Sequence, residues 1–196
     1  MHRDPGAFLG LGSDVDVTAA RYAVLPLPYD GTSTWLKGAD RGPEALLEAS
    51  ANVELYDIIT ASEPWRSGVV TLAAPELPAS PEAMTDVVHA CARQVLAAGK
   101  TLVSLGGEHS VTTGLVRAHA EAHPGLSVLQ LDAHGDTRQS YEGSPYNHAC
   151  VMARVAEVCP YVQVGIRSLD AAEVPGLDPA RTFFAHQYEG TPDQLD

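Results

Sequence analysis

Two short stretches of the chain concentrate side chains that bind metal ions. The first is GGEHS at residues 106–110, which contributes His109, and the second is DAHGD at residues 132–136. In an extended chain alternate residues share a face, so Asp132, His134 and Asp136 can point the same way. Imidazole and carboxylate ligands without a thiolate favour Mn²⁺, Fe²⁺, Co²⁺ or Zn²⁺. The residue types therefore predict a metal site.

The spacing within DAHGD adds a condition on the backbone. If the segment were fully extended, Asp132 and Asp136 would lie ~13 Å apart. That is too far for one ion, or for two ions held ~3.5–4 Å apart. The chain must therefore curl, and we expect Gly135 to permit the curl.

Alternating strand and helix patterns predict how these stretches are positioned. Apolar runs predict strands over residues 22–28, 69–72, 101–105, 126–131, 161–166 and 181–185. Between them, helices are predicted over residues 44–56, 81–98, 110–123 and 147–158, with Ser80, Ser110 and Asn147 as N-terminal caps. Such alternation indicates an α/β fold, with a mostly parallel sheet between helical layers (αβα). Because ligands bind at the carboxyl ends of parallel strands, both metal-binding stretches fall where chemistry is expected.

Composition limits the partners. The 196 residues carry 25 acidic and 12 basic side chains, a net charge of −13, which disfavours nucleic acid and anionic membrane surfaces but suits a small cation. We find no bilayer-spanning apolar run, no secretory leader pattern and an odd number of cysteines, so we expect a cytoplasmic protein. Residues 1–20 are expected to form a loose N-terminal arm, and residues 21–196 the α/β domain.

These motifs resemble the ureohydrolase family, which includes arginase and agmatinase. The resemblance runs from Tyr22 to Ser168 and rests on GGEHS, DAHGD, residues 26–57 (PLPYDGTSTWLKGADRGPEALLEASANVELYD), residues 141–155 (YEGSPYNHACVMARV) and VGIRS at residues 164–168. It is strongest to agmatinases. The resemblance implies an arginase-like fold and a homo-oligomer.

The resemblance also implies the site. It places two Mn²⁺ ions, with His109 and Asp136 on one ion, His134 on the other and Asp132 bridging them. His148 falls where the family has a catalytic histidine. Glu108 is expected to orient His109.

The activity implied is agmatinase-like hydrolysis of a cationic guanidino compound, agmatine, to putrescine and urea. The departing amine needs a proton, which suits His148, and a helix capped by Asn147 would disfavour the charged form of that ring. Alternatives are an arginase, guanidinobutyrase or formimidoylglutamase type of ureohydrolase, or a non-catalytic pseudoenzyme or assembly subunit.

A later D-x-D-x-x-D-P motif, which the resemblance also implies, is not found in the 196 residues. We therefore expect an N-terminal portion of a longer ureohydrolase, with a domain incomplete at its C-terminus, although a natural short form is an alternative. We expect residues 1–196 alone to bind Mn²⁺ weakly and to release no detectable urea. The incomplete sheet is expected to leave a bare edge or an uncovered face.

Overall fold

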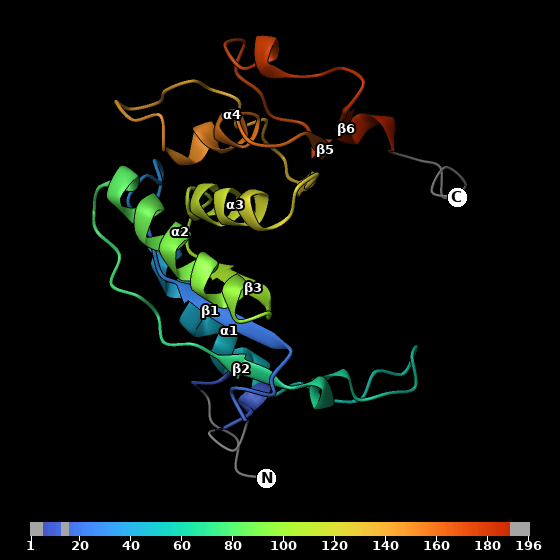
Figure 1. Ribbon diagram of the computed structural model, residues 1–196. Coiled ribbons are helices and arrows are strands. Elements are labelled where there is room, and N and C mark those ends of the chain that lie inside the picture. Colours follow the sequence, from blue (N-terminus) through green and yellow to red (C-terminus); the bar gives the residue numbers. More distant parts are fainter. Residues whose placement is uncertain (1–5, 13–15, 189–196) are drawn as a thin grey trace.

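Strands and helices alternate along the chain in the computed structural model, which describes residues 6–12 and 16–188 (Figure 1). The strands are β1 (Tyr22–Leu27), β2 (Val69–Thr71), β3 (Thr101–Gly106), β4 (Val128–Leu131), β5 (Tyr161–Ile166) and β6 (Thr182–Phe184). The α-helices are α1 (Gly42–Ser50), α2 (Pro81–Ala97), α3 (Val111–Ala122) and α4 (Val151–Val155). Short 3₁₀ turns cover Phe8–Gly10, Ala39–Arg41, Pro64–Ser67, His148–Cys150, Val174–Gly176 and Ala185–Gln187.

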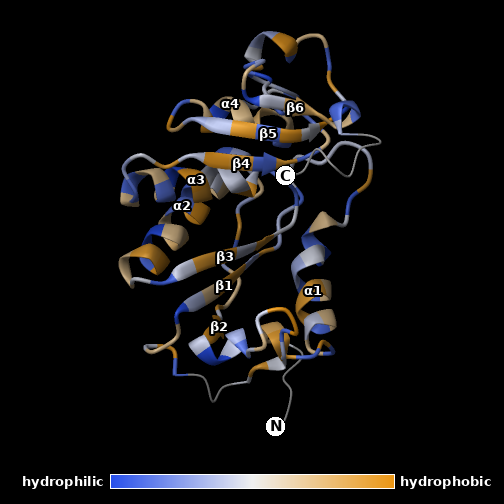
Figure 2. Cartoon of the chain, turned by 90° about the vertical axis from the view of Figure 1, so that its right-hand side faces the viewer, coloured by the Kyte–Doolittle hydropathy of each residue, from blue (hydrophilic) through white to orange (hydrophobic). Residues whose placement is uncertain are grey.

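Every strand pairing in the described part of the chain is parallel, which confirms the predicted fold class. The strands form two three-stranded sheets, in the orders β2-β1-β3 and β4-β5-β6. Figure 2 shows the sheets one above the other, with α2 and α3 on one side of the β1–β3 sheet and α1 on the other. The layered arrangement therefore matches the expectation, while the sheet is divided between β3 and β4.

The apolar face of α2 packs on the central strand of the first sheet. Leu25 and Leu27 of β1 form a core with Met84 and Val88, and all four side chains are buried. The Ser80 hydroxyl accepts a hydrogen bond from the Ala83 amide, as expected for an N-cap. Strand β1 thus packs against α2, the helix that the apolar spacing of residues 81–98 predicted.

Two predicted helices are shorter in the structure. Helix α1 ends at Ser50, whose hydroxyl donates to the Leu47 carbonyl at 2.7 Å and so competes with the backbone pattern that would continue the helix. The helix expected over residues 147–158 is a 3₁₀ turn followed by the five residues of α4. At its end, the Val158 amide reaches the Val155 carbonyl, so the chain leaves in tight turns.

Part of the expected N-terminal arm is packed against the domain. Phe8, Leu9 and the buried Leu11 contact the cluster that includes Val24. The Phe8 amide also donates to Thr71 Oγ1 at 2.8 Å. Residues 7–11 are therefore not loose, because their apolar side chains pack with Val24 and Val69 of the first sheet. Residues 1–5 and 13–15 lie outside the described part.

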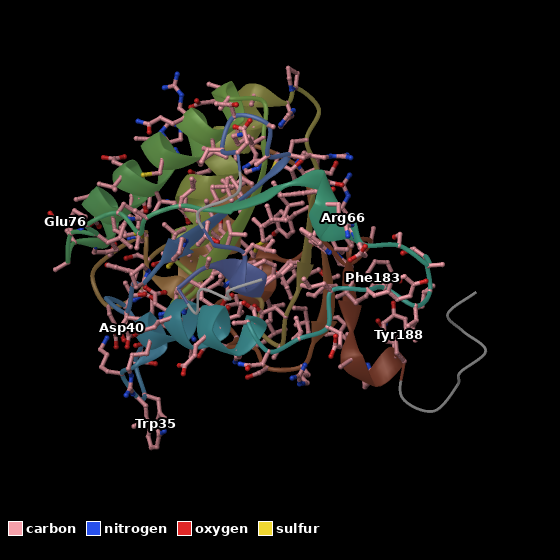
Figure 3. The ribbon with its side chains drawn as sticks, turned by 90° about the horizontal axis from the view of Figure 1, so that it is seen from below. Trp35, Asp40, Arg66, Glu76, Phe183 and Tyr188 are labelled. Atoms are coloured by element: carbon pink, nitrogen blue, oxygen red, sulfur yellow. The ribbon has the colours of Figure 1, made fainter. Side chains whose placement is uncertain are left out.

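Several apolar side chains are exposed. Leu129 and Leu131 on β4 are 63% and 74% exposed and project from the same face of the sheet, so that face is uncovered at β4. Trp35 is 90% exposed and points away from the fold (Figure 3). No helix in the described ranges is both long enough and apolar enough to cross a membrane.

Candidate metal centre

The end of β3 is held tightly against the chain that follows β1. The Gly107 amide donates to the Leu27 carbonyl and the Glu108 amide to the Tyr29 carbonyl, both at 2.9 Å. A Cβ on Gly107 would lie 2.0 Å from the Tyr29 carbonyl oxygen, so only glycine fits this approach. His109, two residues later, is thereby fixed at the carboxyl end of the first sheet.

The curl required after β4 is present, but a different residue provides it. Asp136 has a φ of 50°, in the left-handed region that most side chains avoid. Gly135, expected to permit the curl, has no positive φ. A Cβ there would lie 2.6 Å from Leu169 Cδ2, the end of a flexible side chain, so Gly135 lies in close contact with Leu169. The Asp136 carbonyl accepts a hydrogen bond from the Met152 amide, which holds the unusual conformation.

Three of the four predicted ligands come together at one point. His109 Nδ1 lies 2.8 Å from Asp136 Oδ2 and 3.8 Å from Asp132 Oδ2. One ligand atom from each of these residues lies within 4.8 Å of the others. The His134 ring lies outside this group and is largely exposed, with Nδ1 3.4 Å from Asp132 Oδ1. Asp132 therefore stands between the three-residue cluster and His134.

The carboxylates favour a protonated His109 when no ion is bound. Burial acts to lower the pKa of His109, but the hydrogen bond and charge of Asp136 outweigh it, with help from the charges of Asp132 and Glu108. The His109 pKa therefore lies above its ordinary value. A divalent cation would replace that proton and meet the same negative charges.

A pair of buried glutamines beneath the cluster was not predicted. Gln130 of β4 pairs in register with Gln163 of β5. Gln163 Nε2 donates to Gln130 Oε1 at 2.6 Å and to the Gly135 carbonyl at 2.8 Å, and Gln130 Nε2 lies 3.5 Å from Asp136 Oδ2. Polar residues within two otherwise apolar strands are the signal that could have revealed this support.

A cavity of about 230 Å³ contains the cluster and His148 in its lining. Arg138 and Tyr141, which the sequence did not single out, also line it. The Arg138 guanidinium lies 4.5 Å from the Tyr141 ring centroid and 3.5 Å from Asp170 Oδ2. All five predicted site residues, including the exposed His134, thus line one cavity.

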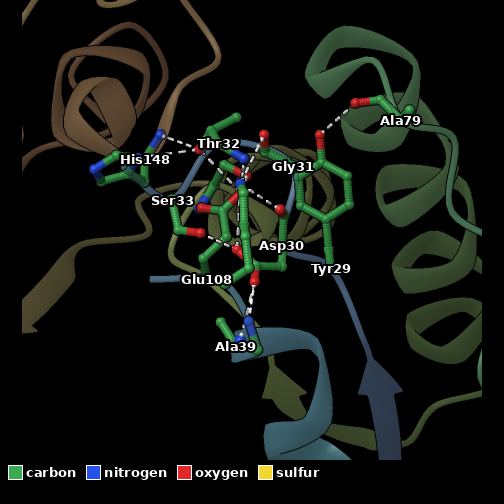
Figure 4. A network of polar contacts seen from close by, with 12 residues as sticks. Tyr29, Asp30, Gly31, Thr32, Ser33, Ala39, Ala79, Glu108 and His148 are labelled. Atoms are coloured by element: carbon green, nitrogen blue, oxygen red, sulfur yellow. Dashed lines mark hydrogen bonds and ion pairs between the residues drawn. The ribbon is translucent and has the colours of Figure 1, made fainter. Parts of the chain in front are cut away.

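Glu108 has a different role from the one expected. Its carboxylate accepts hydrogen bonds from Thr32 (Figure 4) and from Ser110. The His109 ring is hydrogen-bonded to the Asp136 carboxylate instead. The Ser110 side chain, expected to cap α3, donates to Glu108 instead. The sequence missed Thr32, which contacts both Glu108 and His148.

Asn147 accepts a hydrogen bond from the Ala149 amide as a cap should. Because it caps a three-residue 3₁₀ turn and not a long helix, the dipole effect expected on His148 has little structural basis here.

The donor set fits a divalent cation. One imidazole and two carboxylates, converging without a thiolate, suit Mn²⁺, Fe²⁺, Co²⁺ or Zn²⁺. The fold and this cluster define a parallel α/β protein with a candidate metal centre at the carboxyl ends of its strands.

Comparison with known proteins gives the family. The model of the arginase family matches residues 20–189, and the chain therefore belongs to that family. It is 40% identical to an N(1)-aminopropylagmatine ureohydrolase from Synechocystis sp. over 84% of this chain and 56% of the relative, and 33% identical to an agmatinase from Pyrococcus horikoshii over 82% and 56%.

Two solved structures have a fold similar to that of this chain. The agmatine ureohydrolase of Thermoplasma volcanium superposes with a TM-score of 0.79 at 32% identity, covering 88% of this chain and 60% of that one. Proclavaminate amidino hydrolase from Streptomyces clavuligerus gives a TM-score of 0.82 at 26% identity, covering 95% and 66%. The chain thus spans little more than half the length of the curated relatives described above.

Proposed function

We propose that the protein hydrolyses a cationic guanidino compound to urea and an amine, with Mn²⁺ bound by His109, Asp132 and Asp136. The observation that carries the proposal is the convergence of these three side chains in one cavity with His148. Membership of the arginase family and the relatives named as ureohydrolases support it.

A second Mn²⁺ is part of the proposal, with Asp132 shared between the ions and His134 on the outer one. The position of Asp132 between the cluster and the His134 ring supports this assignment. Two ions carry a charge of +4, which two aspartates and one hydroxide do not balance, so further ligands are needed. We therefore propose that binding by residues 1–196 alone is weak.

The chemistry requires both a nucleophile and an acid. A guanidinium carbon is resonance-stabilised and a poor electrophile, and bound divalent cations supply hydroxide near neutral pH. Asp132 and Asp136 would bind the metal ions. His148 would deliver a proton to the departing amine nitrogen. Without that proton, the amine is a poor leaving group.

The substrate class is a guanidino amine, either agmatine or its N(1)-aminopropyl derivative. Relatives named for each compound match this chain, at 33% and 40% identity respectively. The net charge of −13 supports attraction of either cation. The higher identity favours the aminopropyl compound as the first substrate to test.

Calorimetric titration with Mn²⁺ tests the site. Asp136→Asn should weaken binding at least about tenfold, because it removes a charged ligand, while the exposed Asp86→Asn serves as a matched control. Equal affinity in wild type and Asp136→Asn would refute the site.

Urea release tests the activity. It is measured with both compounds for residues 1–196 and for a chain extended to the length of the relatives. We expect urea from the extended chain only. Mn²⁺ binding without urea from either chain would favour the non-catalytic alternative.

A further inference from the structure

Thr32 connects Glu108 to His148. Its Oγ1 lies 3.0 Å from Glu108 Oε1, 2.9 Å from the His148 amide nitrogen and 3.1 Å from His148 Nδ1 (Figure 4). Thr32 and Glu108 are buried, so water competes little for these contacts. A threonine hydroxyl has one proton and two lone pairs, and three partners therefore use all its capacity.

The direction of the hydrogen bond to Glu108 is set by backbone amides, which can only donate. The Thr32 amide reaches Glu108 Oε1 at 3.3 Å, and the Ser110 amide reaches Oε2 at 2.9 Å. Both carboxylate oxygens are thus acceptors, and the Thr32 hydroxyl proton points to Glu108.

The remaining capacity of Thr32 Oγ1 is two lone pairs. The His148 backbone N–H, again an obligate donor, occupies one. The other faces His148 Nδ1, which can complete the arrangement only by carrying a proton. The opposite tautomer would bring two lone pairs together at 3.1 Å.

We infer that Thr32 is a positioning residue that holds neutral His148 as its Nδ1–H tautomer, leaving Nε2 as the nitrogen that exchanges protons in the cavity. The catalytic meaning of this inference rests on the proposed function, in which His148 protonates the amine. The tautomer itself is inferred from the contacts among Glu108, Ser110, Thr32 and His148 and does not depend on the proposed activity.

The loop that carries Thr32 is built to hold it in place. The Asp30 carboxylate accepts hydrogen bonds from the Ser33 hydroxyl and from the Gly38 and Ala39 amides. Burial acts to raise the pKa of Asp30, but these hydrogen bonds outweigh it and keep the pKa below its ordinary value. The loop therefore closes around a charged carboxylate, and Thr32 is fixed at its start.

Long-range ¹H–¹⁵N correlation spectra of the ¹⁵N-labelled chain, without metal or substrate, test the inference. At a pH where the ring is neutral, an unprotonated Nε2 correlates strongly with both carbon-bound ring protons, whereas an unprotonated Nδ1 correlates strongly with only one. His148→Asn assigns the signals among the eight histidines. In the wild type we expect the pattern of an unprotonated Nε2, which corresponds to the Nδ1–H tautomer.

Two variants separate positioning from general structural support. Thr32→Val should change the ratio of the two tautomers by at least about fivefold toward Nε2–H, the effect of one ordinary hydrogen bond. Thr32→Ser should keep the wild-type pattern, as should the control Thr60→Val in an exposed turn.

Nε2–H in the wild type, or an unchanged ratio in folded Thr32→Val, would overturn the inference. If Thr32→Val does not fold, the wild-type spectrum decides alone. Because neither measurement uses turnover, a failure to detect the proposed hydrolysis would not change the conclusion about the His148 tautomer.

Discussion

Replacing Gly107 by alanine should separate the end of β3 from the chain after β1. The added Cβ would lie 2.0 Å from the Tyr29 carbonyl oxygen, about 1 Å inside the 3.0 Å limit below which such atoms essentially never approach. The obstacle is backbone, so no side-chain rotation relieves it. The hydrogen bonds from Gly107 to Leu27 and from Glu108 to Tyr29 must lengthen or break.

The expected cost follows from these contacts. Two backbone hydrogen bonds contribute about 0.5–1.5 kcal/mol each, and overpacking adds about 1–3 kcal/mol. Gly107→Ala should therefore lower the free energy of unfolding by about 2–6 kcal/mol. It should also weaken Mn²⁺ binding, because His109 lies only two residues from the displaced backbone.

Urea denaturation followed by circular dichroism measures the change, with calorimetry for Mn²⁺. Gly125→Ala is the matched control, since a Cβ there meets open space and only its positive φ is penalised. If Gly107→Ala loses no more stability than Gly125→Ala, the close approach of these two segments is not what fixes the loop.

Three further outcomes are expected. The pKa of His109 is raised in the folded state, so protonated His109 stabilises the fold fully below its ordinary pKa of 6.5, and this stabilisation is lost as pH rises through the folded-state pKa. The urea concentration at the unfolding midpoint of the metal-free protein should therefore fall over that pH range, and the fall should be smaller in Asp136→Asn. Burial, with the charge of Glu108, raises the pKa of Tyr29 to about 12, so an absorbance titration should contain one late tyrosine that Tyr29→Phe removes; its absence would contradict the burial of this hydroxyl. Ser80→Ala should cost about 1 kcal/mol in thermal unfolding through loss of the α2 cap, and an unchanged midpoint would show that the cap contributes nothing.

Local patterns predicted the elements well where the side chains that form the pattern are buried. Helix α2 and strand β1 follow from apolar spacing and from a cap, because the same side chains that set the pattern form the core. The end of α1 was misjudged because Ser50 bonds back to its own helix, a choice that propensity does not reveal. The division between β3 and β4 depends on long-range pairing, which the sequence of either strand alone does not encode.

The candidate ligands were found from residue types at strand ends, while their support was missed. Asp136, and not Gly135, adopts the left-handed conformation, because contacts from Met152 compensate for it. Thr32 lies 76 residues from Glu108 and 116 from His148, so no local pattern joins them. Motifs therefore indicated the chemistry, and the fold was needed to show what holds each group.

The candidate centre lies across the division between the two sheets, with His109 after β3 and Asp136 after β4. An ion bound to both would oppose every fluctuation that parts the sheets, adding about 2.7 kcal/mol at a free concentration of 100 times Kd. In hydrogen-exchange measurements without metal, the amides of β3 and β4 should exchange through separate local openings of the two sheets. With metal bound, they should exchange more slowly, through one opening that both sheets share. The bound metal would therefore couple the opening of the two sheets, and its loss would first appear as independent local opening of each sheet.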